Sequence, residues 1–206
     1  MSIDRDTTVR WMELFAQSMD EHRQELVKLD TAIGDGDHGT NMDRGMQKAI
    51  AKLQAEPPAD AGAVLKSVAM TLISTVGGAA GPLYGTLFLQ LGSALSGDGQ
   101  PNLATYAAAW RRAADGVQAR GKAQAGDKTM IDALLPAVAA LEQATDLDDG
   151  LRAATQAAQK GMLATTPLVA RKGRASYLGD RSAGHQDPGA TSTYYLFETA
   201  AAALEG

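Results

Sequence analysis

The stretch at positions 29–41 reads Leu29-Asp30-Thr31-Ala32-Ile33-Gly34-Asp35-Gly36-Asp37-His38-Gly39-Thr40-Asn41. It places three carboxylates, one histidine and three glycines between two segments with helical periodicity. Asp35 and Asp37 are two residues apart, so their side chains lean the same way on an extended backbone, and Asp30 arrives from the end of the preceding helix. Like charges this close repel unless a cation lies between them. Oxygen ligands with no cysteine nearby favour Mg²⁺ or Ca²⁺.

The next helix adds a second feature to this stretch. Thr40 or Asn41 can cap it, and a helix N-terminus attracts anions. A divalent metal beside such a terminus is a place to hold phosphates, and this is the interpretation that the pattern favours.

The same residues are open to three other interpretations. Gly34 to Gly39 spells G-x-G-x-x-G, but the dinucleotide motif needs a preceding strand and no acids facing the pyrophosphate, whereas a helix precedes it here. An EF-hand needs acids and a distant Glu at fixed offsets, and that frame fails. An ordinary solvated Gly-Asp turn remains the open alternative.

Composition bounds the class of protein. The 206 residues carry a net charge of −5, 5% aromatic residues and no cysteine. The length suits a single domain, 1–206. Absence of cysteine excludes disulfides and thiolate metal sites and fits a cytoplasmic protein. Negative charge and few aromatic residues argue against nucleic acid as a partner.

No membrane partner is expected either. Residues 67–97 form an uncharged segment that is long enough to span a bilayer, but the Gly77–Pro82 run interrupts it. Two buried helices joined by a turn explain the segment better. Residues 1–6 lack the apolar core of a signal peptide.

Apolar residues recur at helical spacing in eight segments, and no period-two strand is evident. The predicted helices cover about 7–28, 41–53, 61–76, 83–95, 103–119, 130–143, 150–165 and 190–204. This predicts an all-α, single-domain fold. Glycine-bearing loops follow the first, third, fifth and seventh helices, and alternate connections of an up-and-down antiparallel bundle lie at the same end. We therefore expect all four loops to converge on one rim.

The second and third loops offer anion-binding features. Backbone N–H groups of Gly77–Gly81 could cradle a phosphate, although a tight turn between buried helices explains these residues equally well. Residues 121–129 nearly spell a Walker A loop, but Asp127 interrupts it and no strand precedes it, so a P-loop is rejected. Lys128 and Thr129 could still help to bind an anion.

The fourth loop concentrates positive charge in an acidic chain. Arginine suits phosphate oxygens because its planar fork binds them bidentately. A solvated basic loop is the alternative. The residues concerned are Arg171, Lys172, Arg174, Arg181 and His185. Metal, phosphate-binding backbone and arginine at one rim suit phosphoryl transfer, but no general base or acceptor pocket is evident, so the chain looks like half of a site.

Four motifs, in chain order, carry a resemblance to a known family. They are Gly34-Asp35-Gly36-Asp37-His38-Gly39, Gly77-Gly78-Ala79-Ala80-Gly81-Pro82-Leu83-Tyr84-Gly85, Gly126-Asp127-Lys128-Thr129-Met130 and Arg171-Lys172-Gly173-Arg174-Ala175-Ser176-Tyr177 with His185-Gln186-Asp187-Pro188-Gly189-Ala190. Together they resemble the L (ADP-binding) subunit of phosphoenolpyruvate-dependent dihydroxyacetone kinase, over essentially the whole chain. The resemblance implies an antiparallel eight-helix barrel with a nucleotide site at one rim.

The resemblance also implies the site residues. Two Mg²⁺ ions would be held by Asp30, Asp35 and Asp37, and Arg174 would be the catalytic residue. The bound ADP (or ATP) would be contacted by His38, Gly39, Thr40, Asn41, Ala79, Ala80, Gly121, Met130, Arg174, Asp187, Pro188 and Gly189. The family usually has serine where this chain has Ala80, so one hydroxyl contact to phosphate would be lost.

The implied activity is that of a phosphotransferase (phosphoenolpyruvate–glycerone phosphotransferase) active with partner subunits. The bound ADP would accept a phosphoryl group from a phosphotransferase-system M subunit and pass it to dihydroxyacetone held on a K subunit. Two alternatives remain open. One is a subunit of an ATP-dependent dihydroxyacetone or related ketose kinase, and the other is a nucleotide-dependent module that docks a regulator.

Overall fold

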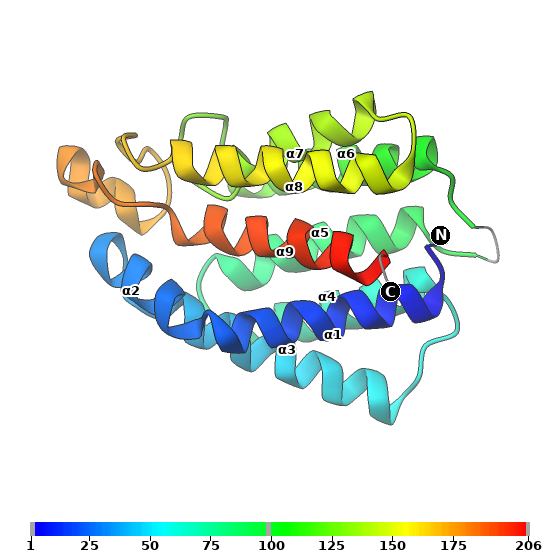
Figure 1. Cartoon of the computed structure of the whole chain (residues 1–206). Helices are drawn as coiled ribbons and strands as arrows, with labels where there is room; N and C mark the ends of the chain where they lie inside the picture. The colour runs from blue at the N-terminus through cyan, green and yellow to red at the C-terminus, as the bar shows by residue number, and fades with distance from the viewer. Residues whose placement is uncertain (1–2, 98–99, 205–206) are drawn as a thin grey trace.

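The computed structural model describes residues 3–97 and 100–204 (Figure 1). Over these residues the chain is helical and has no strand, which confirms the predicted all-α class. The elements are α1 (Arg5–Glu21), α2 (Arg23–Ile33), α3 (His38–Ala55), α4 (Ala61–Thr75), α5 (Ala80–Ala94), α6 (Leu103–Gly121), α7 (Ile131–Gln143), α8 (Leu147–Ala164), the 3₁₀ helix η1 (Arg174–Ser182) and α9 (Pro188–Leu204).

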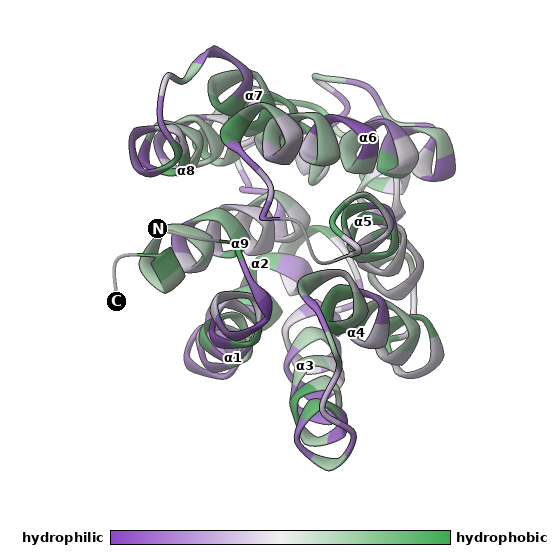
Figure 2. Cartoon of the chain, turned by 90° about the vertical axis from the view of Figure 1, so that its right-hand side faces the viewer, coloured by the Kyte–Doolittle hydropathy of each residue, from purple (hydrophilic) through white to green (hydrophobic). Residues whose placement is uncertain are grey.

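Eight of the described helices form a closed ring, which Figure 2 shows end-on. Each packs against the next in the order α1, α3, α4, α5, α6, α7, α8 and α9, and α9 packs back against α1. Successive helices of the ring run in opposite directions, as the predicted antiparallel eight-helix barrel requires. The remaining helix, α2, continues from α1 towards the left end of Figure 1, where η1 also lies.

Aromatic side chains fill the middle of the ring. The ring of Trp110 stacks on Phe197 with centroids 4.4 Å apart. Trp11 lies 5.8 Å from Trp110 and 6.1 Å from Phe88, and its Nε1 donates to the carbonyl of Leu196 at 3.1 Å. Burying each such side chain contributes ~1.5–3 kcal/mol, so this cluster is a large part of what holds the helices together.

The predicted first helix, about 7–28, is two helices. His22 ends α1 and precedes α2, which continues to Ile33. The His22 ring stacks on Tyr195 at 4.1 Å, and its Nδ1 lies 3.0 Å from a carboxylate oxygen of Glu25. The apolar periodicity continues across the break at His22, so the sequence pattern alone predicts a single helix. These two contacts give His22 a structural role.

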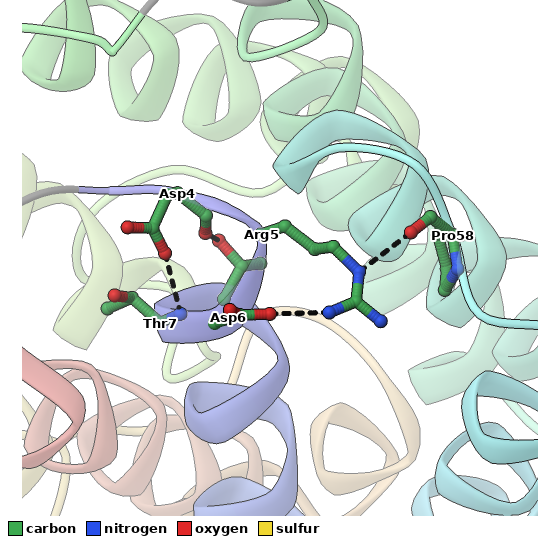
Figure 3. Close-up of polar contacts among 6 residues, drawn as sticks. Asp4, Arg5, Asp6, Thr7 and Pro58 are labelled. Atoms are coloured by element: carbon green, nitrogen blue, oxygen red, sulfur yellow. Dashed lines mark hydrogen bonds and ion pairs between the residues drawn. The ribbon is translucent and has the colours of Figure 1, made fainter.

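The N-terminus of α1 is fixed by polar contacts (Figure 3). The Asp4 carboxylate accepts from the Thr7 backbone N–H at 2.9 Å, and the Arg5 guanidinium contacts Asp6. Arg5 Nε also donates at 2.8 Å to the carbonyl of Pro58, which lies 53 positions further along the chain. This bond ties the start of the ring to the connection between α3 and α4.

The uncharged segment 67–97 divides between α4 and α5, with residues 76–79 as the break. Asp60 caps α4, since its carboxylate accepts the Ala63 N–H at 2.7 Å. Among the described helices none is both long and apolar enough to cross a bilayer.

The α7–α8 contact offers a test of the ring. A Cβ at Gly161 would lie 2.1 Å from the carbonyl oxygen of Asp132, which is backbone and moves little. We expect Gly161→Ala to lower the free energy of unfolding by about 1–3 kcal/mol, measured by urea denaturation. The neighbouring exposed substitution Lys160→Ala is the control and should change it by less than ~0.5 kcal/mol. Equal effects of the two substitutions would contradict this packing.

Candidate functional site

A cavity of about 980 Å³ opens at the end of the ring away from the two chain termini. All four glycine-bearing loops line it, together with the adjoining parts of α5 and α6. The expected convergence of the loops on one rim is therefore confirmed.

Most of the expected site residues line this cavity. They are Asp30, Asp35, Asp37, His38, Asn41, Ala79, Ala80, Gly121, Met130, Arg174, Asp187, Pro188 and Gly189. Two residues of the expected nucleotide-contacting run do not. Gly39 is buried where a Cβ would lie 2.2 Å from the carbonyl of Arg23 on α2, and Thr40 is exposed outside the cavity.

The three aspartates come together at the connection between α2 and α3. One oxygen of each lies within 4.8 Å of the others. Asp30 is in the last turn of α2, and its Oδ2 accepts the backbone N–H groups of Asp37 at 2.9 Å and His38 at 3.1 Å. Asp30 therefore caps α3, and the expected caps Thr40 and Asn41 are wrong because α3 begins earlier, at His38.

A glycine beside the cluster makes room for it. A Cβ at Gly34 would lie 2.1 Å from Asp30 Oδ1, so any side chain there would displace that oxygen. Glycine is thus required at position 34, next to Asp35, by packing as well as by the turn.

The donor set suits a hard divalent cation. It consists of carboxylate oxygens only, and the chain has no cysteine. Arg174 Nη2 lies 3.0 Å from Asp35 Oδ2 and offsets part of the negative charge of the cluster. Asp35 and Asp37 are exposed and Asp30 is half-buried, so an ion reaching them would meet both protein and open space.

His38 is held by a buried polar network. Its Nε2 hydrogen-bonds with Ser192 Oγ at 2.9 Å, and Ser192 hydrogen-bonds with the Tyr84 hydroxyl at 2.7 Å. Burial lowers the pKa of His38 to about 4, against the opposing effect of Asp30. Burial likewise raises the pKa of Tyr84 to about 12. At neutral pH both groups are uncharged, so His38 brings an oriented neutral ring to the cavity.

Asn41 is oriented from behind by Arg44. Arg44 Nη2 donates to Asn41 Oδ1 at 2.6 Å, and Asn41 is buried. Its Nδ2 faces Gly77 of the second loop, 3.7 Å from where a Cβ would stand. The amide donor is thereby directed to the loop that was expected to cradle a phosphate.

Lys128 has a different role from the one expected. The side chain is 1% exposed, and its Nζ donates to the carbonyls of Thr165 at 2.9 Å and Leu168 at 3.0 Å, and to the carbonyl of His185. The expectation that it helps to bind an anion is wrong, because backbone oxygens already use its N–H groups.

The third loop is shaped by a residue that sequence reasoning missed. Asp132 accepts the backbone N–H groups of Gly126 at 2.5 Å and Thr129 at 2.8 Å. The spacing Thr129-x-x-Asp132 at a helix start was a local signal that could have found it. The hydrogen bonds between Tyr84 and Ser192 and between Ser192 and His38 join distant parts of the chain, and no local pattern predicts them.

The fourth loop brings Arg174 to the cavity. The loop contains η1, where no helix is predicted from the sequence, and it packs on α2 through a small apolar cluster of Ile33, Ala170 and Ala175. Lys172 and Arg174 line the cavity. Arg171, Arg181 and His185 of the same basic loop do not, so only part of the expected positive cluster faces the site.

Asp187 caps the last helix from inside the cavity wall. Its Oδ2 accepts the Ala190 N–H at 2.7 Å, and Pro188 occupies the first helical position, where it lacks an N–H that would need a partner. The backbone N–H of Asp187 donates to Thr165 Oγ1 at 3.0 Å. Burial, more than the nearby Asp132, raises the pKa of the Asp187 carboxyl to about 7.

Comparisons with known proteins agree with this geometry. The DAK2 domain model matches residues 32–202. The chain is similar to the PEP-dependent dihydroxyacetone kinase, ADP-binding subunit DhaL, of Escherichia coli (strain K12), with 43% identity over 209 residues and 100% of both chains covered. It is 44% identical over 197 residues to the ADP-binding subunit DhaL of PEP-dependent dihydroxyacetone kinase 1 of Listeria innocua, with 96% of each covered.

A solved structure shares the fold. The dihydroxyacetone kinase from C. freundii in complex with AMP-PNP and Mg²⁺ aligns with a TM-score of 0.73 and 26% identity. The alignment covers 97% of this chain and 34% of that one. The chain thus spans about a third of the length of that kinase.

Asp187 gives the site a measurable pH dependence. Its pKa rises from 3.8 to about 7 on folding, so the folded state binds this proton more tightly and loses stability as the pH rises between these values. Asp187→Asn keeps an oxygen for the Ala190 N–H and removes the titration. In urea unfolding with chelator present, the variant should gain at least ~1 kcal/mol relative to wild type between pH 4.5 and 7.5. A difference that does not change with pH would contradict the assignment.

Proposed function

The chain belongs to the DAK2 domain family, and we propose that it is the ADP-binding subunit of a phosphoenolpyruvate-dependent dihydroxyacetone kinase. The observation that carries this proposal is the carboxylate cluster of Asp30, Asp35 and Asp37 in the lining of the cavity, with Arg174 beside it, 3.0 Å from Asp35. Carboxylate oxygens next to a guanidinium suit a metal-bound polyphosphate.

The three aspartates would hold two Mg²⁺ ions. When bound, these ions neutralise charge on the phosphate oxygens of the nucleotide. The backbone around Ala79 and Ala80 and the amide of Asn41 would contact phosphate oxygens from the other side. Arg174, which pairs with Asp35 at 3.0 Å, would stabilise the negative charge that develops on the transferring phosphoryl group.

The rest of the cavity would hold the nucleoside. The wall formed by Leu83, Gly121 and Met130 is largely apolar, and the cavity continues between α5 and α6. A planar base fits such a wall, since apolar side chains can cover both of its faces. The volume of about 980 Å³ leaves room for a nucleoside diphosphate with its ions.

Two partner subunits complete the reaction in this proposal. The ADP held by the aspartates and Arg174 would accept the phosphoryl group carried by an M subunit. It would pass this group to a hydroxyl oxygen of dihydroxyacetone on a K subunit, and that hydroxyl would lose its proton. The described residues offer no evident acceptor pocket beside the aspartates, which is why the acceptor is assigned to a partner.

The relatives support this route over one with exchangeable ATP. Both DhaL relatives align over almost their whole length, whereas the C. freundii kinase is a chain about three times longer. Both relatives are named as ADP-binding subunits of PEP-dependent kinases. This supports the proposal that donor and acceptor lie on separate subunits and that a tightly held ADP serves as a coenzyme.

The metal assignment is tested by Asp35→Asn. The substitution removes one charged ligand and the partner of Arg174, so Mg²⁺-dependent ADP binding should weaken at least about 100-fold in titration calorimetry. Transfer of phosphoryl groups in a mixture with K and M subunits should fall in parallel. Helix content by circular dichroism should stay unchanged.

Asp20→Asn is the matched control, because Asp20 is an exposed carboxylate on α1, outside the residues that line the cavity. It should leave ADP binding and transfer at wild-type levels. If Asp35→Asn transferred phosphoryl groups as fast as wild type, the metal assignment would be wrong.

A further inference from the structure

Lys128 is a buried cation in a backbone conformation that few lysines adopt. Its φ of +63° is left-handed, and its side chain is 1% exposed. The left-handed backbone turns the side chain into the protein beside the cavity wall, where burial lowers the pKa of the ammonium and the Asp187 carboxylate opposes that shift. Such a costly placement calls for a reason.

The ammonium gathers carbonyl oxygens from two separate places in the chain. It donates to Thr165 at 2.9 Å, Leu168 at 3.0 Å and Thr166 at 3.4 Å, all just after α8, and to His185, just before α9. These positions are the two ends of the fourth loop. Lys128 therefore closes the neck of that loop.

Other bonds at the neck depend on the same geometry. The Arg171 N–H donates to the carbonyl of Asp127, next to the lysine, at 3.1 Å, and the Gly184 N–H donates to Thr166 at 2.8 Å. The Asp187 N–H donates to Thr165 Oγ1 at 3.0 Å. Without a cation, the converging carbonyl oxygens would repel one another, although those of Thr165 and Thr166 would keep the N–H groups of Leu168 and Gly184 as donors.

The loop that leaves this neck carries the basic side of the site. It ends in the Asp187–Gly189 turn and brings Arg174 to within 3.0 Å of Asp35. At its far end it is attached to α2 through Ile33. A change at the neck would therefore shift Arg174 and the turn together, while Asp30 on α2 and the carboxylates of the α2–α3 connection stay in place.

We propose that Lys128 is a positioning residue: its ammonium fixes the fourth loop so that Arg174 and the Asp187–Gly189 turn meet the metal-bound nucleotide. Lys128 itself contacts no phosphate. The inference rests on the nucleotide site proposed above, but its structural step, closure of the neck, can be measured without nucleotide.

The first test compares Lys128→Met with Lys160→Met, which removes an exposed lysine from α8. In hydrogen exchange without nucleotide, amides of residues 168–187 should exchange at least about tenfold faster in Lys128→Met, while α1, α4 and α5 exchange at wild-type rates. Magnesium-dependent ADP affinity should fall at least about tenfold. Lys160→Met should change neither.

A second test asks whether the charge itself is needed. Lys128→Ala leaves space for propylammonium, which supplies the missing carbons and the cation, and this ion should restore protection of 168–187 and part of the ADP affinity. Neutral 1-propanol should restore neither. If Lys128→Met fails to fold, Lys128→Arg keeps the charge and should show intermediate exchange confined to the same segment.

Two results of the exchange experiment would overturn the proposal. Unchanged exchange at 168–187 would mean that the neck does not need Lys128. Faster exchange throughout the chain would mean a general loss of stability. Faster local exchange with unchanged ADP affinity would also overturn it. Absence of ADP binding by the wild type would instead refute the proposed function and leave the exchange experiment to decide the neck.

Discussion

The carboxylate of Asp30 is the contact on which the rest of the site depends. One of its oxygens accepts the first N–H groups of α3, so it fixes the turn between α2 and α3. The same group lies within 4.8 Å of Asp35 and Asp37. Three carboxylates at this distance repel strongly unless cations lie among them. Arg174 supplies one positive charge, and in our account Mg²⁺ supplies the remainder.

The closed ring explains why these groups meet. Alternate connections of an antiparallel ring lie at one end, so the four glycine-bearing loops could be placed together from the order of helices alone. The helix class and the caps Asp60 and Asn102 were also predictable, because capping is local in sequence. The break at His22 and the helix η1 were not. The apolar spacing continues through the break at His22, and η1 is stabilised by contacts with residues that are distant in sequence.

The site divides in the same way between local and distant determinants. The metal cluster and the basic loop are visible in the sequence because their residues are close together in it. The roles of Lys128 and Ser192 are not, since Lys128 bonds to carbonyls 37 to 57 positions away and Ser192 bonds to His38, 154 positions away. The local sequence suggests anion binding by Lys128, because the carbonyl oxygens that surround its ammonium come from distant positions. The structure shows that this charge holds the loop together.

The central claim is that this chain holds ADP as a coenzyme on its carboxylate cluster. The most direct measurement is to purify the protein without added nucleotide, dialyse it extensively in Mg²⁺, denature it and identify what is released. The account predicts ADP in a ratio close to one per chain, and its loss after dialysis with chelator. An empty protein that binds and releases ATP freely would contradict a retained coenzyme, and one that binds neither nucleotide would contradict the site itself.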